Sequence, residues 1–246
     1  MATLVREAWM RKALGNNISS MAAPGAACFS QPVVDTSESN GRAMLDKYTR
    51  VYSTRILTPA ARGLLRLGLG PDAVTVIGTL GVVTGAVAFY PRGEFLWGTL
   101  FITAFVFFDN IDGIMARLSG RKSGWGAFLD STLDRFGDAA IFGGLAMWFA
   151  GRGDNLRMTA LLITCLTLGA VVSYAKARAE SLGYQAGGGI AERADRLVAI
   201  LVITGLVGLF DLPIAVLEVL LWLLAAASAW TVWHRVREVR RQAARE

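Results

Sequence analysis

Cysteine and charged residues are both scarce in this chain. Two of its 246 residues are cysteines, one in a polar leader (Cys28) and one inside an apolar stretch (Cys165). We therefore expect neither a disulfide bond nor a cysteine-ligated metal. Charged residues make up only 18% of the chain and hydrophobic residues 54%, a balance that is too apolar for an ordinary soluble domain.

The sequence also lacks the segments of about ten residues with alternating hydrophobicity that are typical of a membrane β-barrel. Its apolar residues instead come in blocks that are long enough to span a bilayer as helices. We predict an all-α membrane protein with six transmembrane helices, over residues 72–90, 94–117, 125–150, 156–173, 197–210 and 214–233.

Basic residues mark one side of these predicted helices. They precede the first helix, separate the second from the third, flank the loop between the fourth and fifth, and follow the sixth. The opposite connections carry little beyond Arg92, Arg152 and Arg157. The positive-inside rule therefore places both termini on the cytoplasmic side of the cell membrane. No nucleic-acid-binding motif is visible, so the formal net charge of +6 favours anionic lipid and phosphate as partners.

The part of the chain before the predicted helices divides at Met44. Residues 1–43 are rich in Ser, Ala, Gly and Asn without a clean signal-peptide pattern, so we expect a disordered leader or a true start at Met21 or Met44. Residues 44–70 are basic and amphipathic, which predicts an interfacial helix on the cytoplasmic leaflet, broken at Pro59. The membrane domain is expected to span residues 71–237, followed by a basic cytoplasmic tail at 238–246.

Four aspartates lie inside or beside the second and third predicted helices, where an ionised side chain is costly. Two sets of residues follow the helical spacings i, i+3, i+4, i+7 and i, i+4, i+8: Asp109, Asp112, Gly113 and Ala116, and then Gly126, Asp130 and Asp134. Each set forms one stripe on its helix. If the stripes face each other, only bound cations can hold so much like charge together. Carboxylate ligands alone suit Mg²⁺ or Mn²⁺ and argue against zinc.

Spacing alone leaves other interpretations of this acidic run open. An intramembrane aspartate can be purely structural when it pairs with an arginine, and Arg117 and Arg135 are near in sequence, although two arginines cannot neutralise four aspartates. Gly113 and Ala116 either leave room for a flat ligand or allow a close helix–helix contact. Arg117 and Ser123 offer a bidentate phosphate grip and a hydroxyl.

The complete run matches a family pattern, because residues 109–134 read Asp-x2-Asp-Gly-x2-Ala-Arg-x8-Gly-x3-Asp-x3-Asp. This string resembles the signature of the CDP-alcohol phosphatidyltransferases, membrane enzymes that move a phosphatidyl group from a CDP-linked lipid to an alcohol. The resemblance covers roughly residues 44–237, not the leader, and implies a six-span fold and a homodimer.

The resemblance also implies a role for each matched position. A two-metal centre of Mg²⁺, with Mn²⁺ as the other candidate, would be held by Asp109, Asp112, Asp130 and Asp134. Asp134 would in addition accept the proton of the attacking alcohol, and CMP would leave. The CDP-diacylglycerol contacts would be Gly113, Arg117, Ser123 and the start of the first span, Asp72, Ala73, Val74 and Thr75. By itself, a Pro-Asp-x2-Thr string is ordinary helix capping.

A second basic cluster bears on the acceptor alcohol. The strings Ser173-Tyr-x-Lys176-x-Arg178 and Glu192-Arg193-x2-Arg196 resemble the actinobacterial phosphatidylinositol phosphate synthases. In those enzymes the matching residues hold the phosphate of inositol phosphate, which implies an acceptor site of Ser173, Lys176, Arg178, Arg196 and Arg235. Several cations aimed at one point suit a dianionic phosphate better than a neutral polyol. Positive-inside anchoring accounts for the same residues without a ligand.

We therefore expect transfer from CDP-diacylglycerol to 1D-myo-inositol 3-phosphate at the cytoplasmic edge of the membrane. Glycerol 3-phosphate is the alternative acceptor, because it would need the same metal site and a similar phosphate pocket. A divalent-cation transporter is the more distant alternative. It would need acidic residues toward the far side of the membrane, where the sequence offers only Glu218 beyond an apolar stretch that follows Asp138.

Overall fold

The computed structural model describes residues 58–59, 61–118, 124–190 and 192–245. The predicted leader and most of the predicted interfacial helix lie outside these residues; the described remainder of that segment includes a helical stretch over 61–66. A few side chains inside the described helices also lie outside the description: Phe108, Asp109, Asn110, Asp112 and Arg117.

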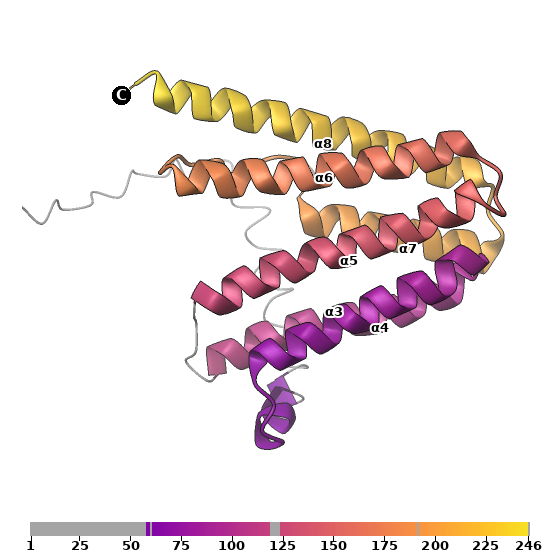
Figure 1. Ribbon diagram of the computed structural model, residues 1–246, viewed down its shortest axis with the longest axis horizontal. Coiled ribbons are helices and arrows are strands. Elements are labelled where there is room, and N and C mark those ends of the chain that lie inside the picture. Colours follow the sequence, from indigo (N-terminus) through magenta and orange to yellow (C-terminus); the bar gives the residue numbers. More distant parts are fainter. Residues whose placement is uncertain (1–57, 60, 119–123, 191, 246) are drawn as a thin grey trace, which may run out of the picture. The chain divides into compact units, whose positions relative to one another are not determined.

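The described part of the chain is all-helical, as the sequence predicts (Figure 1). Its elements are α3 (Pro71–Phe89), the 3-10 helix η1 (Tyr90–Arg92), α4 (Phe95–Leu118), α5 (Gly124–Ala150), α6 (Leu156–Ser181), α7 (Arg193–Phe210) and α8 (Ile214–Ala243). Helices α6 and α8 run past their predicted ends at 173 and 233, and α7 begins before 197. These extensions are polar helical turns, which a search for apolar blocks alone leaves out.

Three segments are long and apolar enough to cross a membrane: Pro71–Arg92, Leu156–Ser181 and Ile214–Ala243. Helix α5 falls short of that criterion because aspartates and an arginine occupy its first half, and α7 begins with charged residues. In α4 the apolar stretch with described side chains runs from Phe95 to Phe107, the last residue before the side chains that lie outside the description. Six membrane spans therefore stay a prediction.

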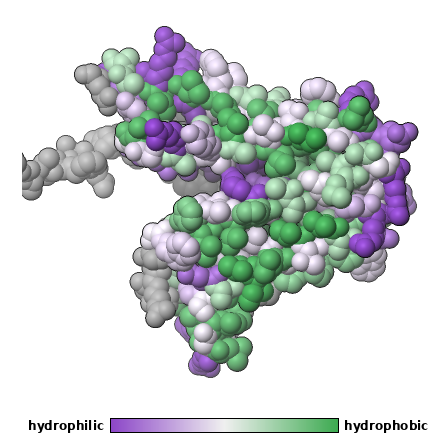
Figure 2. All heavy atoms as spheres, viewed as in Figure 1, coloured by the Kyte–Doolittle hydropathy of each residue, from purple (hydrophilic) through white to green (hydrophobic). Residues whose placement is uncertain are grey.

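Large apolar side chains cover the outside of the helices (Figure 2). Eight that are more than half exposed are Leu80, Trp97, Phe128, Phe136, Met147, Ile163, Trp222 and Leu223. Exposed apolar surface on this scale is unfavourable in water and favourable against lipid chains. On the face seen in Figure 2, the molecule is hollowed between α5 and the α6–α8 pair, and hydrophilic residues lie at the inner end of the hollow.

Helix α5 lies between two partners, since it packs against α3 on one side and α6 on the other. Helix α6 also packs against α8, and α7 packs against α4 and α8. Glycines allow two of these close approaches. A Cβ on Gly144 of α5 would lie 2.6 Å from the Ala86 carbonyl oxygen of α3, and one on Gly208 of α7 would lie 2.5 Å from the Leu96 nitrogen of α4. These contacts fix how α5 and α7 are placed, and both helices carry candidate site residues.

Candidate functional site

Three aspartates follow one another at four-residue intervals along α5. Asp130 is exposed, Asp134 is partly buried and Asp138 is only 8% exposed. The spacing places all three on one face of the helix. The stripe that the sequence predicts through Asp130 and Asp134 therefore continues one turn further, from the surface into the protein.

Asp134 is held by two arginines. Its Oδ1 atom lies 2.8 Å from Nη1 of Arg193, which belongs to α7. Its Oδ2 atom lies 3.6 Å from Nη2 of Arg135, its neighbour on α5. The Asp134 side chain is 17% exposed, so these contacts orient its carboxylate at the border between the buried region and the surface.

Asp138 binds two arginines of α7, one with each carboxylate oxygen. Oδ1 lies 3.2 Å from Nε of Arg193, and Oδ2 lies 3.7 Å from Nη2 of Arg196. Both arginines belong to the first turn of α7, which begins with a capping box between Glu192 and Asp195. The capping box fixes the start of the helix and with it the place where the two guanidinium groups project.

One turn of α6 faces the same group of side chains. The Ser173 hydroxyl accepts a hydrogen bond from Nη1 of Arg135 and donates one to the Gly169 carbonyl at 3.1 Å. Nη2 of Arg196 donates to that carbonyl as well, at 3.5 Å. A Cβ at position 169 would lie 2.9 Å from Nη2 of Arg196, so glycine leaves the space for this guanidinium. Arg196 is only 2% exposed.

Arg235 connects α8 to α6, close to the turn that carries Gly169 and Ser173. Its Nη1 atom donates to the Val172 carbonyl at 2.5 Å, and its Nε atom donates to the Gly188 carbonyl at 3.4 Å. The residue is only 3% exposed. Gly188 belongs to the loop between α6 and α7, so one buried guanidinium joins α8, α6 and this loop.

The same loop is fastened to α8 at two further points. The Ile190 nitrogen donates to Oγ1 of Thr231 at 3.3 Å. Gln185 and Gln242 exchange two hydrogen bonds, of 2.9 and 2.6 Å, between the Gln185 backbone and the Gln242 side chain. The start of the predicted tail at 238 lies inside α8, and Gln242 contacts the loop from this last part of the helix.

The remaining predicted acceptor residues lie on the exposed end of α6. Lys176 and Arg178 are both exposed, and Nη1 of Arg178 donates to Oγ of Ser181 on its own helix at 3.4 Å. The structure therefore brings Ser173, Arg196 and Arg235 to one turn of α6 and places Lys176 and Arg178 beyond it, toward the end of the helix.

The start of α3 lies against the part of α4 that carries the acidic run. Val74 is 1% exposed and belongs to one buried cluster with Ile111, Ile114 and Met115 of α4. Asp72 and Ala73 are exposed. Thr75 is buried and its Oγ1 atom donates to the Pro71 carbonyl at 3.1 Å. The side chain of Val74 is therefore committed to the helix contact, and its backbone nitrogen donates to the Gly70 carbonyl at 3.3 Å.

Gly113 lies in the middle of the acidic run, on a different face of α4 from Ile111, Ile114 and Met115. Within the described part of the chain, no atom lies within 4 Å of a Cβ added at this position. Glycines that serve close helix packing differ, as Gly144 shows with a backbone oxygen at 2.6 Å. Among the described residues, Gly113 therefore makes no close helix contact, and its role in leaving room for a ligand stays a prediction.

The proposed metal centre cannot be traced through all of its residues. The side chains of Asp109, Asp112 and Arg117, and all of Ser123, lie outside the described residues. Among the side chains that are described, no group of three or more His, Cys, Asp or Glu residues is placed to hold a metal ion. The described members of the proposed centre are Asp130 and Asp134, which supply only carboxylate oxygens, as a hard cation prefers.

Sequence reasoning did not select Asp138 and Arg193 as site residues, and it named Arg135 only as a possible ion-pair partner of an aspartate, a contact that the structure shows with Asp134. Asp138 continues the four-residue spacing of Gly126, Asp130 and Asp134, so the register itself was the available signal. Arg193 stands within the quoted string around Arg196. Its partners lie 55 and more residues earlier in the chain, and no local pattern shows such a pairing.

Among the described residues of this network, cations outnumber anions. The guanidinium groups of Arg135, Arg193, Arg196 and Arg235 are joined through contacts with α5 and α6, while the described carboxylates that they contact are those of Asp134 and Asp138. Nε of Arg135 is buried without an acceptor among the described residues. A guanidinium group with a buried donor to spare is suited to an anionic ligand.

Glu218, which the sequence places toward the other end of the helices, is engaged in a double ion pair. Its two carboxylate oxygens each lie 3.1 Å from a different nitrogen of Arg157, so α6 and α8 are joined there. The Glu218 side chain is 18% exposed. This bidentate ion pair accounts for an acidic residue at this position, so Glu218 need not belong to a cation pathway.

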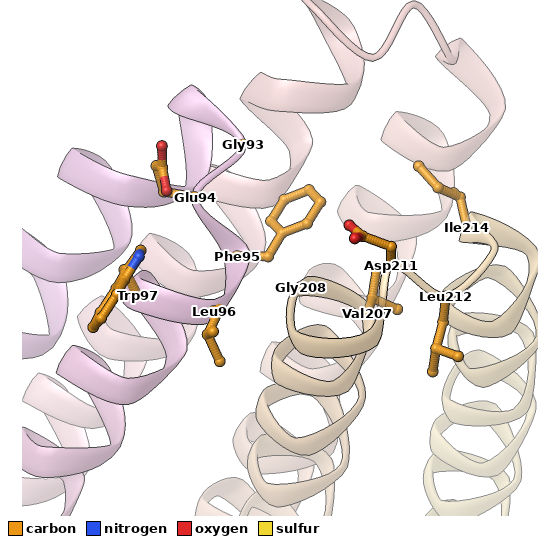
Figure 3. Close-up of a pocket in the computed structure, with 10 residues that line it drawn as sticks. All are labelled: Gly93, Glu94, Phe95, Leu96, Trp97, Val207, Gly208, Asp211, Leu212 and Ile214. Carbon is orange, nitrogen blue, oxygen red and sulfur yellow. The ribbon is translucent and has the colours of Figure 1, made fainter.

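A cavity of about 370 Å³ lies at the start of α4 and the end of α7, whereas Arg193 and Arg196 lie at the start of α7 (Figure 3). In Figure 3 the ring of Phe95, at the start of α4, points toward Asp211, which follows α7. The lining residues are Gly93, Glu94, Phe95, Leu96, Trp97, Val207, Gly208, Asp211, Leu212 and Ile214. None of the predicted site residues is among them, so this cavity and the arginine network are separate features.

Comparisons with known proteins agree with the sequence motif. The family model described as CDP-alcohol phosphatidyltransferase matches residues 69–233. The phosphatidylinositol phosphate synthase of Streptomyces avermitilis is 55% identical over 209 residues, which cover 83% of this chain and 86% of that protein. The enzyme of the same name from Mycolicibacterium smegmatis is 43% identical over 194 residues, covering 78% of this chain and 87% of that protein.

Solved structures of the Mycobacterium tuberculosis phosphatidylinositol phosphate synthase are similar in fold as well as sequence. The one with CDP-DAG bound has a TM-score of 0.70 and 42% identity, and the match covers 75% of this chain and 94% of that chain. The one in complex with manganese and citrate has a TM-score of 0.71 and 42% identity, covering 74% and 88%. The chain therefore belongs to the CDP-alcohol phosphatidyltransferase family and is a transferase.

Proposed function

We propose that this chain is a phosphatidylinositol phosphate synthase, which transfers the phosphatidyl group of CDP-diacylglycerol to 1D-myo-inositol 3-phosphate and releases CMP. The observation that carries this proposal is the network of Arg135, Arg193, Arg196 and Arg235, which joins α5, α6, α7 and α8 and in which Arg196 and Arg235 are buried. The similarity to phosphatidylinositol phosphate synthases, at 43% to 55% identity in the two relatives above, supports it.

The acceptor's phosphate is the group that this network suits. Guanidinium groups bind phosphate oxygens through paired N–H donors, and they do so most strongly where water is excluded. Arg196 and Arg235 are 2% and 3% exposed. A neutral polyol carries no negative charge to compensate the two guanidinium groups, whereas the phosphate group of a phosphorylated polyol does. Ser173 would add a hydroxyl beside them, and the exposed Lys176 and Arg178 would attract the anion from solution.

The cytidine nucleotide would lie between the start of α3 and the acidic run of α4. Val74 packs there against Met115 and its neighbours, and Gly113 lies on another face of α4, with no described atom within 4 Å of a Cβ added to it. Asp72, Ala73, Val74 and Thr75, together with Gly113, Arg117 and Ser123, would contact the CDP group. The acyl chains would extend along the exposed apolar surface of the helices, where lipid is also expected.

Two divalent cations, Mg²⁺ or Mn²⁺, would be held by Asp109, Asp112, Asp130 and Asp134. A solved relative in complex with manganese supports this assignment. When bound, such ions neutralise a pyrophosphate and polarise the phosphorus that is attacked. Asp134 would take the proton of the attacking hydroxyl, and its ion pair with Arg193 would keep the carboxylate in one orientation for that step.

The proposed placement in the membrane follows from the charges. Six spans would put both termini, the arginine network and the aspartates on the cytoplasmic side of the plasma membrane, where CDP-diacylglycerol and a soluble acceptor meet. A homodimer is proposed from the family resemblance.

One experiment tests the acceptor directly. Purified protein in lipid vesicles is given CDP-diacylglycerol, Mg²⁺ and either inositol phosphate or glycerol 3-phosphate, and CMP release is measured for each. We expect CMP release with inositol phosphate and little with glycerol 3-phosphate. Product formed only from glycerol 3-phosphate would contradict the proposed acceptor. Uptake of Mn²⁺ into the vesicles without any CMP release would contradict the proposed transfer reaction and favour cation transport.

A further inference from the structure

Asp138 divides its carboxylate between two arginines that are one helical turn apart. Oδ1 contacts Nε of Arg193 at 3.2 Å and Oδ2 contacts Nη2 of Arg196 at 3.7 Å. Residues at i and i+3 of a helix lie on the same face, so both guanidinium groups project from α7 toward α5. A single carboxylate of α5 thus sets the separation of two cations on α7.

Burial strengthens the electrostatic interaction between Asp138 and these two arginines. Asp138 is 8% exposed and Arg196 is 2% exposed, in a part of the protein with little water to screen charge. Two guanidinium groups so close together repel each other unless an anion lies between them. Asp138 supplies that anion before any substrate is present, and it therefore fixes both groups in advance of binding.

Arg193 connects this pair to the reacting end of the site. Its Nε atom contacts Asp138 at 3.2 Å, while its Nη1 atom contacts Asp134 at 2.8 Å. The two aspartates are one turn apart on α5, and the arginine lies across both. Asp138 consequently limits how far the Arg193 side chain can move toward Asp134 or away from it.

From this geometry we infer that Asp138 is a positioning residue for the acceptor: through Arg193 and Arg196 it holds the guanidinium groups where they receive the acceptor's phosphate. The inference rests on the proposed function and deepens it. It adds a residue outside the family string at 109–134, and Asp138 itself need not touch either substrate.

The test is Asp138→Asn in the full chain, with initial rates of CMP release measured against each substrate in turn. The substitution keeps the shape of the side chain and removes its charge. We expect the KM for inositol phosphate to rise about tenfold, as is usual when a partner that orients a ligand group is lost, with kcat and the KM for CDP-diacylglycerol changed by less than about threefold.

The matched control is Glu218→Gln, which removes the charge of another carboxylate paired with an arginine between helices. It should leave the KM for both substrates unchanged. If Asp138→Asn leaves the acceptor KM unchanged, or raises the KM for both substrates equally, Asp138 only stabilises the fold and the inference is wrong. If Asp138→Asn cannot be recovered from membranes, Asp138→Glu is measured instead. That variant keeps the charge but displaces it by one methylene, and the same selective rise in acceptor KM is expected.

A binding measurement separates this inference from the proposed function. The thermal shift that inositol phosphate or inorganic phosphate produces in the protein, without CDP-diacylglycerol, reports the anion site alone. Smaller shifts in Asp138→Asn than in Glu218→Gln support the positioning role even if transfer uses a different phosphorylated acceptor. Equal shifts in the two variants contradict the role, whichever acceptor the wild-type protein uses.

Discussion

Arg193 of α7 and Asp134 of α5 form an ion pair, with Nη1 of the arginine 2.8 Å from Oδ1 of the aspartate. The two helices that carry them are not consecutive, because α6 lies between them in the chain. The side chain proposed to accept the proton is thus oriented by the same helix start that supplies Arg196 to the acceptor site. Binding of the acceptor and activation of its hydroxyl would therefore depend on one structural unit.

Asp134→Asn should abolish transfer while binding of CDP-diacylglycerol largely persists. Asparagine keeps the size of the side chain but cannot take a proton, and loss of a general base costs about 10²- to 10⁴-fold in rate. CMP release reports transfer, and the thermal shift caused by CDP-diacylglycerol reports binding. Asp154→Asn is the control, because Asp154 is exposed and has a positive φ of 41°, which asparagine tolerates. Equal loss of transfer and binding would make Asp134 chiefly a metal ligand.

Gly113→Ala and Gly144→Ala should have opposite effects on stability and activity. At Gly144 the new Cβ would lie 2.6 Å from the Ala86 carbonyl oxygen, so α3 and α5 must separate, at a cost of about 1–3 kcal/mol. At Gly113 the space is open, and alanine in a helix is favoured over glycine by about 0.5–1 kcal/mol.

Thermal inactivation and CMP release, measured on both variants, check this pair. We expect Gly144→Ala to inactivate at a lower temperature, and Gly113→Ala to stay folded but to bind CDP-diacylglycerol poorly. Normal lipid affinity in Gly113→Ala would show that the open space beside α4 does not receive the nucleotide.

Removal of divalent cations should stop transfer reversibly. Chelation with EDTA is expected to end CMP release, and Mg²⁺ or Mn²⁺ should restore it, because carboxylate oxygens bind hard cations. Asp130→Asn should raise the metal concentration needed for half-maximal activity, since Asp130 is exposed on α5 and available as a ligand. Full activity in EDTA would contradict the metal centre altogether.

Arg235→Lys should lower both stability and acceptor affinity. Lysine keeps the charge but lacks the planar group that reaches the Val172 and Gly188 carbonyls together. Loss of a hydrogen bond donated by a charged group costs about 1.5–3 kcal/mol. The thermal inactivation temperature and the KM for inositol phosphate measure the two effects. Arg237→Lys, at an exposed arginine over the Trp233 ring, is the control and should change neither.

The helices follow closely from the sequence because apolar blocks dictate where a chain can cross lipid. The predicted span 125–150 differs by one residue from α5, which runs Gly124–Ala150. The ends of α6 and α8 were harder to predict, because their last turns are polar. The last turns of α8 are stabilised by a distant contact, since the Gln242 side chain hydrogen-bonds the backbone of Gln185, 57 residues earlier.

The network around Asp138 lay beyond the reach of sequence reasoning for a related reason. Helical spacing places residues on a face, but it does not say which other helix meets that face. Arg196 and Lys176 have similar local surroundings in the sequence, yet one is 2% exposed and the other lies on the surface. This difference depends on how α6 and α7 rotate against α5 and α8, which only the packed structure determines.

The fastening of the α6–α7 loop to α8 has a consequence for the thermodynamics of binding. A free loop of this length would lose conformational entropy when a ligand drew its two ends together. Here Gln185, Gly188 and Ile190 are already bonded to α8, so that entropy is lost when the chain folds. An acceptor that reaches Arg196 and Arg235 therefore meets a preorganised loop, and more of its interaction energy appears as affinity.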